Sequence, residues 1–195
     1  MKINHALLAL PALVFSATLV QAQSPDPTRI YVHSISYGGS GSPQGTVGSS
    51  FSNDRESFTL IFDSFVASSG PGVSITESQK NSQLNINYRA AKVGKLAVDL
   101  RGYVNLPAGV SATVSVIAYD EKGKAKTSTE TFQGPVSMDY LFSEKIHLAQ
   151  TKGAVAPKNL SLVIKLAGDL QSQAQITVDS IDGAIWAAGD GNINE

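Results

Sequence analysis

The chain has 195 residues, no cysteine, and 15 lysine and arginine residues against 16 aspartate and glutamate residues. Because positive charge is not clustered, this balance excludes a surface for the phosphate backbone of nucleic acids. The lack of cysteine excludes thiol chemistry, cysteine–metal sites and lipoprotein attachment.

The first 22 residues have the three parts of a secretory signal peptide. Lys2 precedes an apolar run from Ala6 to Val20, and short residues before a cleavage point after Ala22 complete the pattern. The run is shorter than the roughly 20 residues that a membrane-spanning helix needs, and Pro11 interrupts it. We therefore predict an exported chain, secreted or periplasmic, with no membrane contact after cleavage.

The remaining 173 residues (195 − 22) have a length that suits one domain. Residues 23–28 contain two prolines and are expected to form a flexible leader. Residues 29–187 are predicted to form a single domain, and residues 188–195 a polar C-terminal tail.

From residue 29 onward, apolar and polar residues alternate with a period of two, which is typical of half-buried β-strands. A loop rich in glycine and serine, residues 38–45, follows the first strand. The clearest alternating segments are residues 29–35, 57–66, 83–88, 96–100, 112–118, 125–132, 160–166 and 174–178.

The segment 57–66 has large apolar residues on both faces, with Phe58 and Leu60 on one and Ile61 and Phe65 on the other. A strand of this kind is expected in the middle of a sheet, covered on both sides. The segments 112–118 and 125–132 are expected to form a hairpin in which Gly123 supplies the positive φ of the turn. Residues 140–150 are ambiguous, because a single helical turn fits there as well as a strand.

Eight to ten strands at this spacing, with no convincing helical period, predict an all-β fold. We expect an antiparallel β-sandwich of two sheets, similar to a jelly roll. No internal repeat is visible.

Seven stretches carry a resemblance to a known family. They are GSGSPQG (39–45), SFTLIFD (57–63), GPGV (70–73), KNSQLN (80–85), DLRGYV (99–104), FQGPVS (132–137) and TVDSIDG (177–183). In this order the chain resembles the secreted family known as domain of unknown function 4360, found in fungi and in bacteria. The resemblance covers nearly the whole chain after the signal, and it implies no catalytic residue.

The resemblance also implies paired cysteines that this chain lacks. Ser42 and Ser82 stand where the family typically has cysteine, a later Cys-Gly pair has no counterpart around residues 151–157, and Trp186 is followed by a polar tail. Loss of a disulfide typically costs about 2–5 kcal/mol. We therefore expect burial to stabilise this member, and a bacterial periplasm or secretion route to be its destination.

Nucleophilic and histidine–metal chemistry find little support. The chain has no Gly-x-Ser-x-Gly motif, and only His33 and His147 follow the signal. A histidine–metal site needs two or three converging imidazoles, whereas these two are far apart in sequence. We predict no catalytic residue and no cofactor.

Calcium is the one cofactor for which candidate ligands exist, because it prefers carboxylate and carbonyl oxygens from loops. Asp179, Asp182 and Asp190 are weak candidates of this kind. Asp-Gly sequences are first of all turn signals, so the turn is the preferred interpretation and calcium the alternative.

A carboxylate pair for glycoside hydrolysis requires two groups roughly 5–9.5 Å apart in a cleft. Asp63, Glu77, Asp99 and Asp179 are available, but the sequence does not pair them. Aromatic rings that stack on sugars are the other usual signal. The candidates are Tyr31, Tyr37, Tyr88, Tyr103, Tyr119, Tyr140 and Trp186.

The leading hypothesis is a non-enzymatic exported module that binds an extracellular or cell-surface ligand, with carbohydrate or another surface polymer slightly preferred. One alternative is a hydrolase that acts on extracellular polysaccharide through a carboxylate pair. The other is a structural or host-interaction protein with no small ligand.

Overall fold

The computed structural model describes residues 29–120 and 122–189, which form two antiparallel sheets and one short 3₁₀ helix, η1 (Ile75–Ser78). The five-stranded sheet contains β1 (Tyr31–Gly38), β5 (Gln79–Arg89), β7 (Val110–Tyr119), β8 (Ala125–Gln133) and β10 (Ala156–Gly168). The seven-stranded sheet contains β2 (Val47–Phe51), β3 (Ser57–Phe62), β4 (Val66–Ser69), β6 (Gly94–Leu106), β9 (Val136–Leu148), β11 (Ala174–Thr177) and β12 (Ser180–Ala187). The predicted two-sheet sandwich is confirmed.

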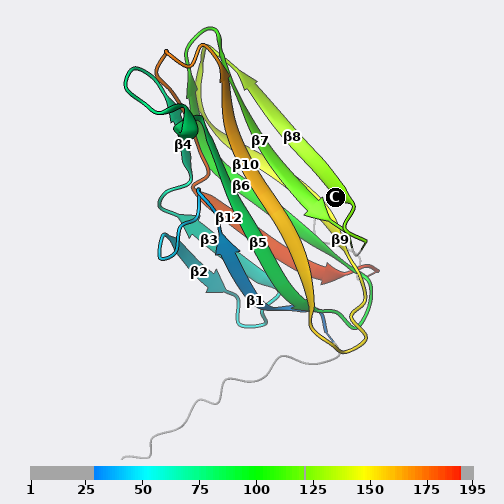
Figure 1. The fold of residues 1–195 in the computed structure, drawn as a ribbon. Helices are drawn as coiled ribbons and strands as arrows, with labels where there is room; N and C mark the ends of the chain where they lie inside the picture. The colour runs from blue at the N-terminus through cyan, green and yellow to red at the C-terminus, as the bar shows by residue number, and fades with distance from the viewer. Residues whose placement is uncertain (1–28, 121, 190–195) are drawn as a thin grey trace, which may run out of the picture.

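The five-stranded sheet has the order β1–β5–β10–β7–β8, and it crosses in front of the other sheet in Figure 1. The order of the other sheet is β2–β3–β12–β6–β11–β4, and β9 pairs with β6. Side chains that face inward from both sheets form one apolar core. In β7, for example, every second residue is buried: Val110, Ala112, Val114, Val116 and Ala118. The alternation seen in the sequence therefore marks the inner face of the sheet.

Some sequence-based expectations need correction. The described residues contain twelve strands instead of eight to ten. The ambiguous segment 140–150 belongs to β9 as far as Leu148, and all thirteen residues of β9 pair with β6 in one continuous register. Within the described residues, no helix is long and apolar enough to span a membrane.

The expected strand 57–66 is two strands that lie apart in the same sheet. β3 lies between β2 and β12, whereas β4 lies beyond β11. The chain turns at Ser64, whose carbonyl accepts a hydrogen bond from Val66 N, and the ring of Phe65 enters the core. The expectation that this segment is covered on both faces is also wrong, because Ile61 is 56% exposed. β3 is an interior strand with one face in solvent.

The passage from β11 to β12 is organised around Gly102. A Cβ atom at Gly102 would lie 2.1 Å from the carbonyl oxygen of Thr177, so only glycine admits that carbonyl. The same oxygen accepts a hydrogen bond from the buried Tyr140 hydroxyl on β9. Phe132 packs against the Tyr140 ring, with ring centroids 5.1 Å apart. Three strands of the sheet are thus joined at one point.

Ser42 and Ser82, the two positions at which the family resemblance implies cysteine, are in contact. Both are completely buried, and their hydroxyl oxygens lie 2.6 Å apart. The neighbouring backbone also pairs, since Gly41 N donates to Asn81 O at 2.7 Å. A hydrogen bond thus joins the loop before β2 to strand β5 at the place where a disulfide would fit.

The predicted signal peptide (1–22), the leader (23–28) and the end of the tail lie outside the described residues. The boundaries of the domain stay a prediction.

We expect the double variant Ser42→Cys/Ser82→Cys to form a disulfide on oxidation. It closes a loop of 41 residues (82 − 42 + 1), which corresponds to about 2–4 kcal/mol of stabilisation and a rise in melting temperature of roughly 4–15 °C. Thermal melts with and without reductant, together with thiol titration, measure this effect. The single variants are the controls, and two free thiols in the oxidised double variant would contradict the contact.

We expect Tyr140→Phe to reduce the free energy of unfolding by about 1–3 kcal/mol, because the buried Thr177 carbonyl loses its donor. Burial, followed by the charges of Asp179 and Glu130, raises the pKa of Tyr140 above its ordinary value of 10. The unfolded chain therefore releases this proton first, and the native protein loses stability as pH rises above 10. Urea denaturation between pH 8 and 11 should show a smaller alkaline loss for Tyr140→Phe than for the native chain.

Candidate functional site

The outer faces of the two sheets differ in charge. On the seven-stranded sheet, residues that alternate with buried neighbours along β6, β9 and β12 include charged groups of both signs. They are Lys95, Asp99, Arg101, Asp139, Lys145 and Asp182. This mixed, charged face is ordinary for a surface in water.

The outer face of the five-stranded sheet is almost free of charge. Among its outward positions, which the strand register defines, the charged residues of the described chain are Arg89 and Lys165, at opposite ends of the sheet. Hydroxyl and amide side chains lie between them, together with the half-buried Ile117 and Val163, and we call this surface the amide–hydroxyl face. Its members are Ser34, Ser36, Gln83, Asn85, Asn87, Thr113, Ser115, Thr127, Thr129, Asn159 and Ser161.

Hydrogen bonds across strands hold these side chains in place. Asn85 Nδ2 donates to Asn159 Oδ1 at 2.6 Å, and Gln83 Nε2 donates to Ser161 Oγ at 2.7 Å, both between β5 and β10. Asn87 Nδ2 donates to Ser34 Oγ at 3.2 Å, between β5 and β1.

The other side of the face has a similar link, because the hydroxyls of Ser115 and Thr129 join β7 to β8 at 2.8 Å. Every pair of neighbouring strands in the sheet except β10–β7 is therefore connected by an outward side-chain hydrogen bond among the described residues. The face is ordered before any ligand arrives.

These bonds leave hydrogen-bonding capacity toward solvent. A primary amide has two N–H donors and a carbonyl with two lone pairs, and the bond between Asn85 and Asn159 uses one donor and one lone pair. Gln83 and Asn159 are exposed, and Asn85 is half-buried. Donors and acceptors thus lie side by side on a fixed lattice with the spacing of the strands, about 4.7–4.9 Å.

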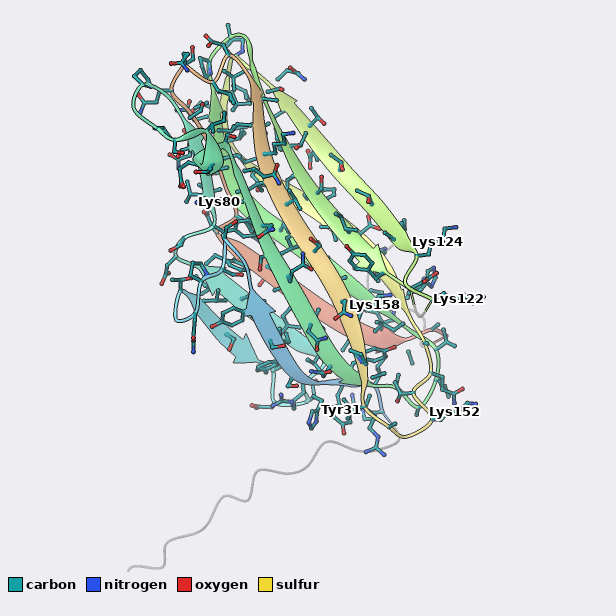
Figure 2. All side chains as sticks on the ribbon, viewed as in Figure 1. Tyr31, Lys80, Lys122, Lys124, Lys152 and Lys158 are labelled. Carbon is teal, nitrogen blue, oxygen red and sulfur yellow. The ribbon has the colours of Figure 1, made fainter. Side chains whose placement is uncertain are left out.

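A hollow of about 420 Å³ lies at one end of the face. Tyr119 and Asn159 belong to the outer surface of β7 and β10 and also line this hollow, together with His147 and Lys158. Lys158 Nζ donates to the carbonyl of Tyr119 at 2.8 Å. Lys122, at the tip of the β7–β8 hairpin, also lines the hollow. Figure 2 shows Lys124 at the same tip and Lys152 in the loop before β10.

The structure separates the two histidines, because His33 lies on β1 of the five-stranded sheet and His147 on β9 of the other. Groups of three or more histidine, aspartate and glutamate residues fit to hold a metal ion are absent from the described part of the chain.

Of the calcium candidates, Asp182 accepts hydrogen bonds on both oxygens, from Thr59 at 2.7 Å and from Arg101 at 3.2 Å. Asp179 is exposed at the passage from β11 to β12, and its backbone pairs with Arg101 and Phe62. Asp190 lies outside the described residues. Calcium binding at these positions stays a prediction.

Among the carboxylates considered for hydrolysis, Asp99 lies next to a second carboxylate, Asp182, that the sequence did not pair with it. It lies directly opposite Asp182 across β6 and β12, on the outer face of the seven-stranded sheet. Glu77 instead binds Lys80 at 2.8 Å. The two opposed carboxylates share their surroundings with Arg101, which binds Asp182.

The aromatic candidates divide by burial. Tyr31, Tyr88 and Tyr140 are in the core, whereas Tyr37, Tyr103, Tyr119 and Trp186 are partly exposed. The sequence pointed to none of these in particular. The amide–hydroxyl face was also missed, although its signal is visible as Gln, Asn and Thr at every second position in 83–87 and 127–131.

Comparison with known proteins identifies the relatives. The family described as domain of unknown function (DUF4360) matches residues 28–188. An uncharacterized secreted protein of Arthroderma benhamiae is 39% identical over 168 residues, covering 82% of this chain and 69% of its own length. The prediction that the chain is exported is thereby confirmed.

Solved structures resemble the fold only distantly. TmCBM61 in complex with beta-1,4-galactotriose has 10% identity and a TM-score of 0.36, covering 81% of this chain and 91% of its own. The CBM22-1 xylan-binding domain of Paenibacillus barcinonensis Xyn10C has 14% identity and a TM-score of 0.31, covering 78% and 87%. A protein of infectious bursal disease virus, Gx strain, has 15% identity and a TM-score of 0.37, covering 93% and 39%. At such values the likenesses carry no argument about function.

Proposed function

Because the chain belongs to the secreted family described as domain of unknown function (DUF4360), we propose its role from its own surface. It is an exported, non-enzymatic binding module, and its amide–hydroxyl face binds a neutral, hydroxyl-rich polymer such as a polysaccharide. One observation carries the proposal: the outer face of the five-stranded sheet presents amides and hydroxyls in place of the charges that cover the other sheet.

Neutral polysaccharides match this chemistry because each sugar hydroxyl both donates and accepts. An amide offers a donor and an acceptor next to each other, which suits a pair of neighbouring hydroxyls. Binding over a face with few charged groups also avoids most of the cost of removing water from unpaired charges. The cross-strand hydrogen bonds of Asn85 and Gln83 reduce the entropy lost when those side chains are ordered by a ligand.

The expected affinity is modest. Each neutral hydrogen bond contributes about 0.5–1.5 kcal/mol net, and several of them must offset the cost of association. Dissociation constants of about 10 μM to 1 mM follow for a short oligosaccharide. Tyr119, at the end of the face, adds a ring on which a sugar can stack.

The rival hydrolase hypothesis has one supporting observation, the opposition of Asp99 and Asp182. It requires turnover that is lost in Asp99→Asn, whereas the binding module retains its full affinity in that variant. Polysaccharide hydrolysis measured by release of reducing ends separates the two hypotheses. Turnover that depends on Asp99 would replace the proposal with the rival.

We expect Asn85→Ala/Asn159→Ala to weaken binding to neutral polysaccharides about tenfold or more, because it removes a cross-strand amide pair from the face beside the hollow. Affinity electrophoresis and pulldown on insoluble glycans measure this, with and without calcium to test the Asp179 and Asp182 candidates. The protein is made in a bacterial host, so that Asn159-Leu160-Ser161 carries no glycan.

The matched control is Asn105→Ala/Gln175→Ala, which removes an exposed cross-strand amide pair from β6 and β11 of the other sheet. It should leave binding unchanged. Equal binding by both double variants, or no binding of the native chain to any neutral glycan in a broad panel, would contradict the proposal.

A further inference from the structure

Strand β9 forms a free edge of the seven-stranded sheet. Within the described residues it pairs with β6 alone, over all thirteen positions and without a bulge. In Figure 1 it runs along the side of the sandwich near β8. One set of its backbone N–H and C=O groups bonds to β6, and the alternate set points away from the sheet.

This edge lacks three of the features by which edge strands usually avoid association, although it does carry charged side chains, among them the inward-facing Glu144, which binds Lys126 of β8. Such strands tend to be short, bulged, or interrupted by proline, because a long regular edge is a template for another strand. The interior of β9 contains neither a proline nor a bulge. Two large apolar side chains are exposed on it, Met138 at 46% and Leu141 at 50%.

The charges of β9 are self-complementary. Asp139 and Lys145 lie three residues before and three residues after Phe142, and both are exposed on the outer face of the sheet. An antiparallel copy of the strand, centred on Phe142, therefore places Asp139 opposite Lys145 twice, since the two residue numbers sum to twice 142. Opposite charges directly across two strands stabilise their pairing.

We infer that β9 pairs with β9 of a second copy of this chain, antiparallel and centred on Phe142, to form a two-fold dimer with one continuous sheet. On the outer face, Asp139 meets Lys145 and Leu141 meets Ser143 of the second copy. On the inner face, Met138 meets Ile146 of the second copy.

Neighbouring registers fit less well. In an antiparallel pair, side chains of the same face lie opposite one another only when the pair is centred on a residue. The nearest alternative registers are therefore centred on the residues before and after Phe142. A centre at Leu141 places Lys145 opposite Ser137, and a centre at Ser143 places it opposite Leu141. A centre at Ser143 also places Asp139 opposite His147, so only the centre at Phe142 pairs Asp139 with Lys145 at both symmetry-related positions. The interface is isologous, so it closes at two copies and does not propagate.

The geometry has a consequence for ligand binding. A two-fold axis that relates antiparallel neighbours is perpendicular to their sheet, so both five-stranded sheets lie on the same side of the continuous sheet. The two amide–hydroxyl faces then point in the same direction. This consequence, unlike the dimer itself, rests on the proposed function: two faces toward one polymer surface increase the apparent affinity through effective concentration.

Sedimentation equilibrium of the secreted chain tests the dimer directly. We expect a mass near that of two chains at high concentration, and dissociation on dilution or with added salt, which screens the exposed charges. Asp139→Lys and Lys145→Asp should each raise the dissociation constant about tenfold or more, because each places like charges opposite one another. The charge-swapped double variant Asp139→Lys/Lys145→Asp should return the dissociation constant to that of the native chain. Melting temperatures of dilute, monomeric samples check that the variants fold.

The absence of cysteine permits a second test that reports on register. Leu141→Cys/Ser143→Cys should form a covalent dimer on mild oxidation, because position 141 lies opposite position 143 of the second copy. Each single variant should stay mostly uncrosslinked, since its cysteines are displaced by two positions. A mass of one chain at all concentrations, or a charge swap that fails to restore association, would overturn the inference. Loss of glycan binding with an intact dimer would overturn only the proposed function.

Discussion

The inward-facing apolar side chains of the two sheets bury one another, and the other features of the molecule depend on that contact. Alternate residues of β7 and β10 meet those of β6 and β12 in one core, so each of these strands has one face assigned to the interior and one to water. Without cysteine the chain holds this arrangement by packing and hydrogen bonds. The buried hydrogen bond between Ser42 and Ser82 is one of these contacts, at two positions where the family resemblance implies cysteine.

Once the inner faces are occupied, the outer faces are free to differ. The outer face of β6, β9 and β12 is charged, with Arg101 bound to Asp182, while that of β5, β10 and β7 presents linked amides and hydroxyls. Stability does not require this contrast, because charged residues are equally compatible with the outside of a strand. A surface of neutral donors and acceptors, fixed by neighbouring strands, is suited to a neutral polymer, and the sandwich acts as its rigid support.

Edges complete the description of the surface. The five-stranded sheet ends at β1 and β8, and the other sheet has the long free edge of β9. Face and edge serve different interactions, because a face offers side chains and an edge offers backbone groups. Placing Asp139 and Lys145 symmetrically about Phe142 allows the same strand to serve both copies of a dimer without changing the fold of either.

The sequence by itself determined the all-β class, the export signal, the family and most strands, because period-two alternation and local turn residues are read over a few neighbouring positions. It marked 83–88 and 125–132 as strands. It did not reveal that Asn85 meets Asn159, that Asp99 opposes Asp182, or that 57–66 divides at Ser64 into two separated strands. Those facts depend on which strands become neighbours, and strand order arises from packing between residues far apart in the chain. Only the tertiary structure decides it.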